Sequence, residues 1–143
     1  MDVARNLSGL VVTAGARACA LPIEHVVETM RPLPVEPMPG APKFVLGLAT
    51  VRGAPLPVVG LSALLGVASP RTPTRFVTVR VAARSVSLAV DAVEGVVAHD
   101  RAKFEALPPL VRDAGDAIEA LAPLDDRFLL VLRAARLLRD EVS

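Results

Sequence analysis

The sequence predicts a mainly β protein, built as a pair of small barrels that share one core. About nine or ten short apolar runs recur at a spacing of roughly 8–12 residues, which is typical of closed or sandwiched sheets. Turn-forming residues separate these runs. Two proline-rich segments, residues 31–42 and 68–74, divide the 143-residue chain into sub-blocks. Two small barrels therefore fit the pattern better than one large barrel.

The first half of the chain alternates short strands with breakers. Residues 7–14 alternate weakly between apolar and polar, and an Ala-Gly-Ala turn separates them from a second strand at residues 17–21. Pro22 starts one helical turn, because proline is well suited to the first position of a helix. The remaining elements expected before the second linker are strands at 26–30, 48–51 and 56–59, and a short helix at 62–65 that ends at Gly66.

The second half begins with the clearest alternation. Val77, Val79 and Val81 face one side, with Thr78 and Arg80 on the other, which predicts a strand that is wet on one face. A strand at residues 86–90 repeats this pattern, with Ser87 opposite the valines and leucine. The other elements expected here are a strand at 93–97, helical turns at 100–107 with Asp100 as N-cap, a hairpin of strands 118–124 and 127–132, and a C-terminal helix at 133–142.

The composition excludes several classes of function. Hydrophobic residues make up 52% of the chain and aromatic residues only 3%, with no tryptophan or tyrosine, so valine, leucine and alanine must build the core. The net charge is +1. Because stacking platforms and basic grooves both lack their residues, we expect no nucleic-acid binding. Residues 53–70 carry no charge, but they contain prolines and glycines and are too short for a spanning helix, so we expect no membrane insertion.

No cofactor or metal site is expected. The single cysteine, Cys19, lies in an apolar run and is interpreted as a small buried hydrophobe. His25 and His99 are far apart and have no cysteine nearby, whereas metal sites need three or four convergent ligands. The N-terminus has no basic leader before an apolar segment, so a cytoplasmic location is expected.

We also expect no enzymatic activity. Glu24 and Glu28 are four residues apart, but no second acidic cluster completes an acid–base pair. Ser62 lacks the second glycine of a nucleophile elbow and is better explained as a helix N-cap. Arg52, by contrast, lies at a tight Arg-Gly turn among apolar neighbours without any nucleophile beside it. This arrangement favours a surface that binds another protein.

Four segments stand out when they are taken in order along the chain. They are a V-x-E within residues 21–28, GLATVRGAPLPVVGLSALLG at 47–66, VDAVEGV at 90–96 and DRFLLV at 126–131. Together they resemble the CheW-like coupling proteins of bacterial chemotaxis, whose G-x-x-N-x-R-G-x-x-x-P-V-V-D-L segment is similar to residues 47–66. The resemblance runs from about Leu10 to Leu138, nearly the whole chain. Thr50 and Gly60 depart from the family's asparagine and aspartate, which points to a divergent paralogue.

The resemblance implies one CheW-like domain over residues 1–143, with two SH3-like five-stranded barrels and a few short helices. We place lobe one at about residues 20–75, and lobe two at about 76–132 together with the N-terminal strand. The implied function is a non-catalytic adaptor between the cytoplasmic tip of a chemoreceptor and the regulatory domain of the histidine kinase CheA. The family also implies an ion pair between Arg52 and Glu28.

The predicted partner-binding residues are Val26, Glu28, Arg52, Gly53, Val90 and Asp91. Val26 is included because neighbouring residues of a strand point to opposite faces, so a buried Val27 would leave Val26 exposed beside Glu28.

Three alternatives remain open. One is a similar adaptor in a non-flagellar pathway, such as pilus motility or development. Another is a small β-barrel enzyme or small-molecule binder, which requires a deep pocket with convergent polar groups. The third is a structural subunit that assembles with itself through exposed strand edges.

Overall fold

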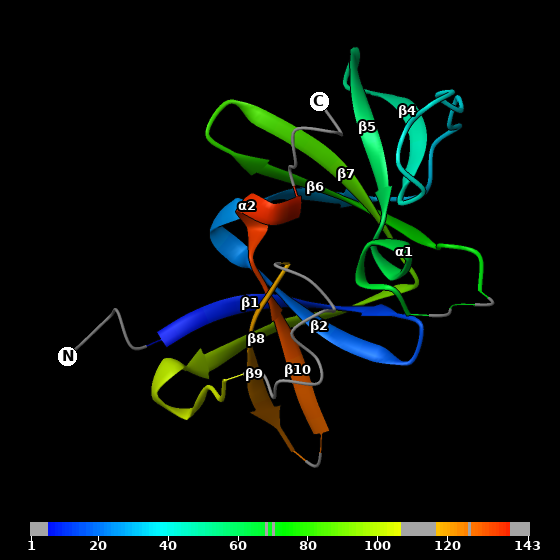
Figure 1. The fold of residues 1–143 in the computed structure, drawn as a ribbon. Helices are drawn as coiled ribbons and strands as arrows, with labels where there is room; N and C mark the ends of the chain where they lie inside the picture. The colour runs from blue at the N-terminus through cyan, green and yellow to red at the C-terminus, as the bar shows by residue number, and fades with distance from the viewer. Residues whose placement is uncertain (1–5, 68, 70, 107–116, 126, 138–143) are drawn as a thin grey trace.

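The computed structural model describes residues 6–67, 69, 71–106, 117–125 and 127–137. This part of the chain forms two five-stranded sheets, which confirms the predicted mainly β fold. Figure 1 shows the two lobes one above the other, with the short helices α1 (Leu61–Leu65) and α2 (Ala134–Leu137) at their junction.

Lobe one is the sheet with strand order β3-β6-β7-β5-β4. Its strands are β3 (Val26–Met30), β4 (Val45–Val51), β5 (Ala54–Gly60), β6 (Arg75–Val81) and β7 (Arg84–Val90). The helix α1 (Leu61–Leu65) follows β5 and ends at Gly66, whose left-handed backbone is the predicted C-cap. Ser62 lies inside α1, and the residue before the helix is Gly60, so the predicted N-cap role of Ser62 is wrong.

Lobe two is the sheet with strand order β8-β1-β2-β10-β9. Its strands are β1 (Asn6–Ala14), β2 (Arg17–Pro22), β8 (Ala92–Asp100), β9 (Ile118–Leu124) and β10 (Arg127–Leu132). Besides α1, the described part of the chain contains three short helical segments, namely η2 (Ile23–His25), η3 (Arg101–Lys103) and α2 (Ala134–Leu137). Asp100 accepts a hydrogen bond from the backbone N–H of Ala102 at 3.0 Å, so it caps η3 as predicted. Predicted helical residues 107 and 138–142 lie outside the described residues.

The predicted division between the lobes does not follow the sheets. Residues 76–90 were assigned to lobe two, but β6 pairs with β3, and β7 pairs with β5 in parallel through Val58 and Ser87. Parallel neighbours need a crossover connection. The connection from β5 to β7 runs through α1, the proline-containing linker and β6, so the linker lies within lobe one and is not a boundary between lobes. Conversely, β2 lies wholly in lobe two, because it pairs with β1 and β10.

The strands β6 and β7 are buried on both faces, which corrects the expected wet face. Thr78 is 5% exposed and Ser87 is fully buried. The cause is the position of β6 and β7 in the middle of the sheet, where one face packs on lobe two and the other lines the interior of lobe one.

The hydrophobic core has three parts. The largest lies between the sheets and combines valines and leucines of both lobes with α1 and α2. A second cluster fills lobe two and a third fills lobe one. Cys19 belongs to the shared core, where burial raises the pKa of its thiol to about 12 against a smaller opposing effect of Arg17. At neutral pH this cysteine is a protonated, apolar side chain.

Asp91 fastens the junction between the lobes. Its carboxylate accepts hydrogen bonds from the backbone N–H of Gly15 at 2.8 Å and from the hydroxyl of Ser69 at 3.0 Å. Its own N–H donates to the carbonyl of Thr13 at 2.8 Å, and its carbonyl accepts from the hydroxyl of Thr74. The residue therefore ties the β1–β2 turn of lobe two to the crossover linker of lobe one.

We expect Asp91→Ala to lower the free energy of unfolding by about 2 kcal/mol, because hydrogen bonds to a charged group are lost and a partly buried N–H is left without its partner. Urea unfolding followed by circular dichroism measures this loss. Asp91→Asn should lose less, since its amide oxygen can still accept a bond. Glu119→Ala removes an exposed carboxylate on β9 and should change stability by less than about 0.5 kcal/mol. Equal effects of Asp91→Ala and Glu119→Ala would contradict the role given to Asp91.

Candidate functional site

The Arg-Gly turn between β4 and β5 holds Arg52 away from the core. The ladder of the hairpin ends at the pair Val51 and Ala54, so Arg52 and Gly53 form a two-residue loop. Both have positive φ, 53° and 81°, which is the backbone of the tight turn that fits the twist of a hairpin. This conformation costs a non-glycine residue about 1 kcal/mol. The side chain of Arg52 is 78% exposed.

A β-bulge positions Glu28 on β3. Val26 pairs with Val79 and Glu28 pairs with the next residue, Thr78, so Val27 is an extra residue in the ladder. A bulge of this kind bends the strand and redirects its side chains. The side chain of Val27 is therefore exposed, and that of Glu28, 22% exposed, reaches the turn that carries Arg52.

Arg52 and Glu28 form a bidentate ion pair. Nε of Arg52 donates to one carboxylate oxygen at 3.0 Å, and the second guanidinium nitrogen donates to the other at 2.6 Å. The structure therefore contains the ion pair that the resemblance implied. Since β3 and β4 are the two edges of the sheet, the pair bridges the open seam of lobe one. A planar guanidinium held at both nitrogens has a fixed orientation on the surface.

The ion pair shifts the titration of both groups. Hydrogen bonds from Arg52, reinforced by its charge, hold the pKa of the Glu28 carboxyl below its ordinary value of 4.5, against a smaller opposing effect of desolvation. The same interaction raises the pKa of the Arg52 guanidinium. Because the pair is exposed to water, it contributes little to stability. Its clearest effect is to fix the shape and charge of this surface.

The structure brings together only some of the predicted site residues. Glu28, Arg52 and Gly53 lie at one place. Val26 is half-buried and packs against the shared core, while Val27 is 53% exposed, so the expected orientation of these two valines is wrong. The bulge is the physical reason, and a single sequence gives no direct signal for it. Val90 is a core residue and Asp91 is a buried junction residue, so neither side chain lies on the surface.

A second exposed ion pair, which the sequence did not reveal, lies on lobe two. The guanidinium of Arg127, at the start of β10, donates to the carboxylate of Glu94 on β8 at 2.8 Å. Val96 and Phe128, from the same two strands, are 60% and 53% exposed. Each lobe thus presents an arginine–glutamate pair and exposed apolar side chains.

Two other kinds of feature are absent from the described residues. These residues contain no group of three or more histidine, cysteine, aspartate or glutamate side chains placed to hold a metal ion. In the same part of the chain, no helix combines the length and apolar character needed to cross a membrane.

The titration of Glu28 tests the ion pair directly. A carboxylate with a lowered pKa in the folded state stabilises the fold above the ordinary pKa, and that contribution is lost as the pH falls through the folded value. We expect carbon-detected NMR to place the Glu28 midpoint below 4.5 in the wild type and nearer 4.5 in Arg52→Ala. Arg127→Ala serves as the control, because it leaves the Arg52–Glu28 pair in place and should leave the Glu28 midpoint at its wild-type value. An unchanged Glu28 midpoint in Arg52→Ala would rule out the pair in solution.

Comparison with known proteins agrees with this geometry. A family model described as the CheW-like domain matches residues 8–142. The chemotaxis protein CheW of Rhizobium meliloti (strain 1021) is 38% identical over 82 residues, which cover 56% of this chain and 53% of that protein. The chemotaxis protein CheW of Helicobacter pylori (strain ATCC 700392 / 26695) is 22% identical over 129 residues, covering 89% of this chain and 78% of that protein.

A solved structure extends the similarity to three dimensions. The crystal structure of the scaffolding protein TtCheW from Thermoanaerobacter tengcongensis superposes with a TM-score of 0.79 at 25% identity, covering 89% of this chain and 88% of that one. A family model that spans nearly the whole chain and a fold shared at that level agree with each other. The chain belongs to the CheW-like family.

Proposed function

We propose that this chain is a non-catalytic adaptor that couples chemoreceptors to a CheA-type histidine kinase in the cytoplasm. The observation that carries the proposal is the Arg52–Glu28 pair, an oriented ion pair on the surface of a CheW-like domain. The relatives named above are chemotaxis or scaffolding proteins, which supports the same function. The pathway served is either flagellar chemotaxis or another chemosensory system, such as pilus motility or development.

The proposed docking surface consists of Arg52, Gly53, Glu28 and the exposed Val27. Arginine is enriched at the energetic centres of protein interfaces, where its rigid fork can hydrogen-bond to a partner while its stem packs on apolar groups. Glu28 uses its carboxylate to hold that fork in place. Val27 adds exposed apolar area beside the charges. The strained turn at Arg52 is consistent with selection for presentation of this side chain, because strained backbone clusters at functional sites.

Val90 and Asp91, which were predicted to contact a partner, serve another purpose in this proposal. Both are buried, and Asp91 holds the two lobes together. They support the relative position of the lobes, so substitutions there would act on binding only through the fold.

The binding test uses the purified regulatory domain of a CheA-type kinase and a fragment of the cytoplasmic tip of a chemoreceptor. We expect Arg52→Ala to weaken binding of at least one partner about tenfold, which corresponds to the loss of one interface anchor. Glu28→Ala should weaken binding less, since it frees Arg52 without removing it. Isothermal titration calorimetry measures both constants, and circular dichroism verifies that the variants remain folded.

The matched control is the other exposed ion pair. Arg127→Ala on lobe two removes an arginine with a comparable bond to a glutamate, 2.8 Å long. An equal loss of affinity from Arg127→Ala and Arg52→Ala would contradict an interface centred on lobe one. Wild-type protein that binds neither partner would refute the adaptor function itself. The double variant Arg52→Glu, Glu28→Arg separates the two roles, because recovery of binding would show that the pair acts as a unit.

A further inference from the structure

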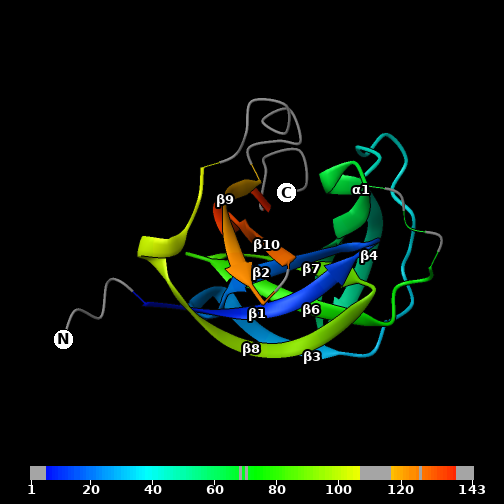
Figure 2. The ribbon, with the colours of Figure 1, turned by 90° about the horizontal axis from the view of Figure 1, so that it is seen from below.

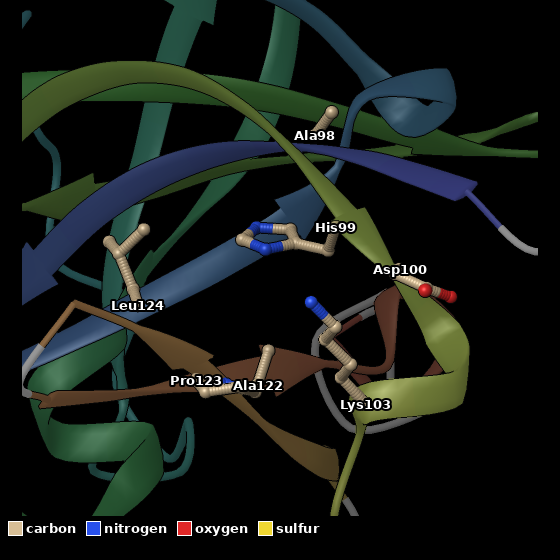
Figure 3. Close-up of a pocket in the computed structure, with 7 residues that line it drawn as sticks. All are labelled: Ala98, His99, Asp100, Lys103, Ala122, Pro123 and Leu124. Atoms are coloured by element: carbon tan, nitrogen blue, oxygen red, sulfur yellow. The ribbon is translucent and has the colours of Figure 1, made fainter.

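Lobe two contains a hollow at the seam between its edge strands β8 and β9. Its volume is about 350 Å³, within the range of small-molecule sites. The lining residues come from the end of β8, from η3 and from the end of β9, namely Ala98, His99, Asp100, Lys103, Ala122, Pro123 and Leu124. Figure 3 shows the ring of His99 directed into the space between these elements, with Lys103 on the same side.

The two lobes share one construction, which allows their interiors to be compared residue by residue. In both sheets the first three strands are antiparallel, the third and fourth are parallel, and the fourth and fifth are antiparallel. One bulge interrupts the ladder between the first two strands in each lobe, at Val27 in β3 and at Glu94 in β8. Counting three pairs from the bulge gives Met30 opposite Phe76 in lobe one, and Val97 opposite Gly9 in lobe two.

The filling of the two interiors differs at this matched position. In lobe one, Phe76 is 3% exposed and packs with Met30 and Leu33. In lobe two the matched residue is Gly9, and the methyl group of Ala20 and the ring of His99 lie where its side chain would point. The surrounding cluster is rich in small residues, since four of its seven buried members are alanines. Val97, Phe104 and Leu124 pack against this cluster, and the hollow opens beside Leu124.

His99 occupies part of the space beside Gly9 and has an unused polar atom. The residue is 6% exposed, and its Nε2 is buried without a hydrogen-bond partner among the described residues. A Cβ at position 9 would lie 3.6 Å from that nitrogen, so the glycine leaves the ring room. Burial lowers the pKa of the imidazole, which is therefore neutral near pH 7. A buried polar atom without a partner is unfavourable, and a ligand could satisfy it.

The charges around the hollow favour an anionic head group. The carboxylate of Asp100 accepts the N–H of Ala102, and Figure 3 shows it pointing away from His99. In the same view the amine of Lys103 points toward the hollow. Lys103 has no ion-pair partner in the described part of the chain. The opposite wall, formed by Ala122, Pro123 and Leu124, is apolar.

We propose that lobe two binds a small carboxylate with an apolar body. Its carboxylate would pair with the Lys103 ammonium and accept a hydrogen bond from Nε2 of His99. Its apolar body would lie against Ala122, Pro123 and Leu124, which form the apolar wall of the hollow. This site lies on the other lobe from the Arg52 surface, and its existence does not depend on the proposed adaptor function.

The experiment uses the full chain and two probes, sodium benzoate and sodium hexanoate, with benzyl alcohol and hexan-1-ol as neutral counterparts. For ligands of this size we expect dissociation constants on the order of 1 mM. Because the chain has two histidines, the ring signals of His99 and His25 can both be followed by NMR. The carboxylates should shift the His99 signals in a saturable way and leave those of His25 unchanged. Saturable binding of the alcohols with equal affinity would overturn the assignment of an anionic ligand.

The chain also offers a matched pair of lysines, Lys103 and Lys43. Lys103→Gln should weaken carboxylate binding about tenfold, because it removes a charge-assisted bond, whereas Lys43→Gln should have no effect. His99→Phe should fill the space beside Gly9 and abolish binding. If that variant does not fold, the wild-type shifts and the lysine pair still decide the outcome. Absence of any saturable shift at His99, or equal effects of the two lysine variants, would overturn the proposal.

Discussion

Each lobe has to close a five-stranded sheet whose edge strands do not share a full ladder. The edges are β3 and β4 in lobe one, and β8 and β9 in lobe two. In each lobe, the chain that leaves the first edge makes a two-bond bridge to the last edge. Glu36 exchanges hydrogen bonds with Leu48 at 2.8 Å, and Glu105 exchanges them with Leu121 at 2.8 and 2.9 Å. Figure 2 shows how far the sheet of lobe two curls to bring its edges together. Every other feature of the molecule depends on this closure.

The two ion pairs lie where the edges of each sheet meet. This location explains how exposed charges that add little stability can still fix the geometry of the surface. The pair of Arg52 with Glu28 joins a hairpin at one edge to the strand at the other. Arg127 and Glu94 span the corresponding side of lobe two. Water screens such pairs, so they add little to the free energy of unfolding. Their location nevertheless gives the surface a defined geometry. In each pair the glutamate lies on the first edge strand and the arginine lies at the hairpin of the opposite edge, and the closed barrel holds both in place.

Local sequence patterns predicted the strands well and the arrangement of strands less well. Alternation and turn residues located most elements, since these depend on neighbours in the chain. The proline-containing linker was interpreted as a boundary because the parallel pairing of β5 with β7 is a long-range feature without a local signature. The bulge at Val27 also has no local signature in the sequence, so the predicted exposure of Val26 and Val27 is the reverse of the observed one. The family resemblance located Glu28 and Arg52. The sequence shows His99 only as an isolated histidine, since no short motif reports that Gly9 makes room for its ring.

The two lobes share one pattern of strand pairing, so features found in both can be distinguished from features found in only one. The bridges at Leu48 and Leu121, the two bulges and one parallel strand pair recur in both sheets, so they belong to the construction that the two lobes share. The side chains that fill the two interiors differ. The position that Phe76 holds in lobe one is held by Gly9 in lobe two. A barrel that closes with either an aromatic ring or no side chain at this position does not need that ring for closure. Closure therefore does not dictate the interior filling of lobe two, and the proposed ligand would give Nε2 of His99 the hydrogen-bond partner that the described residues do not supply.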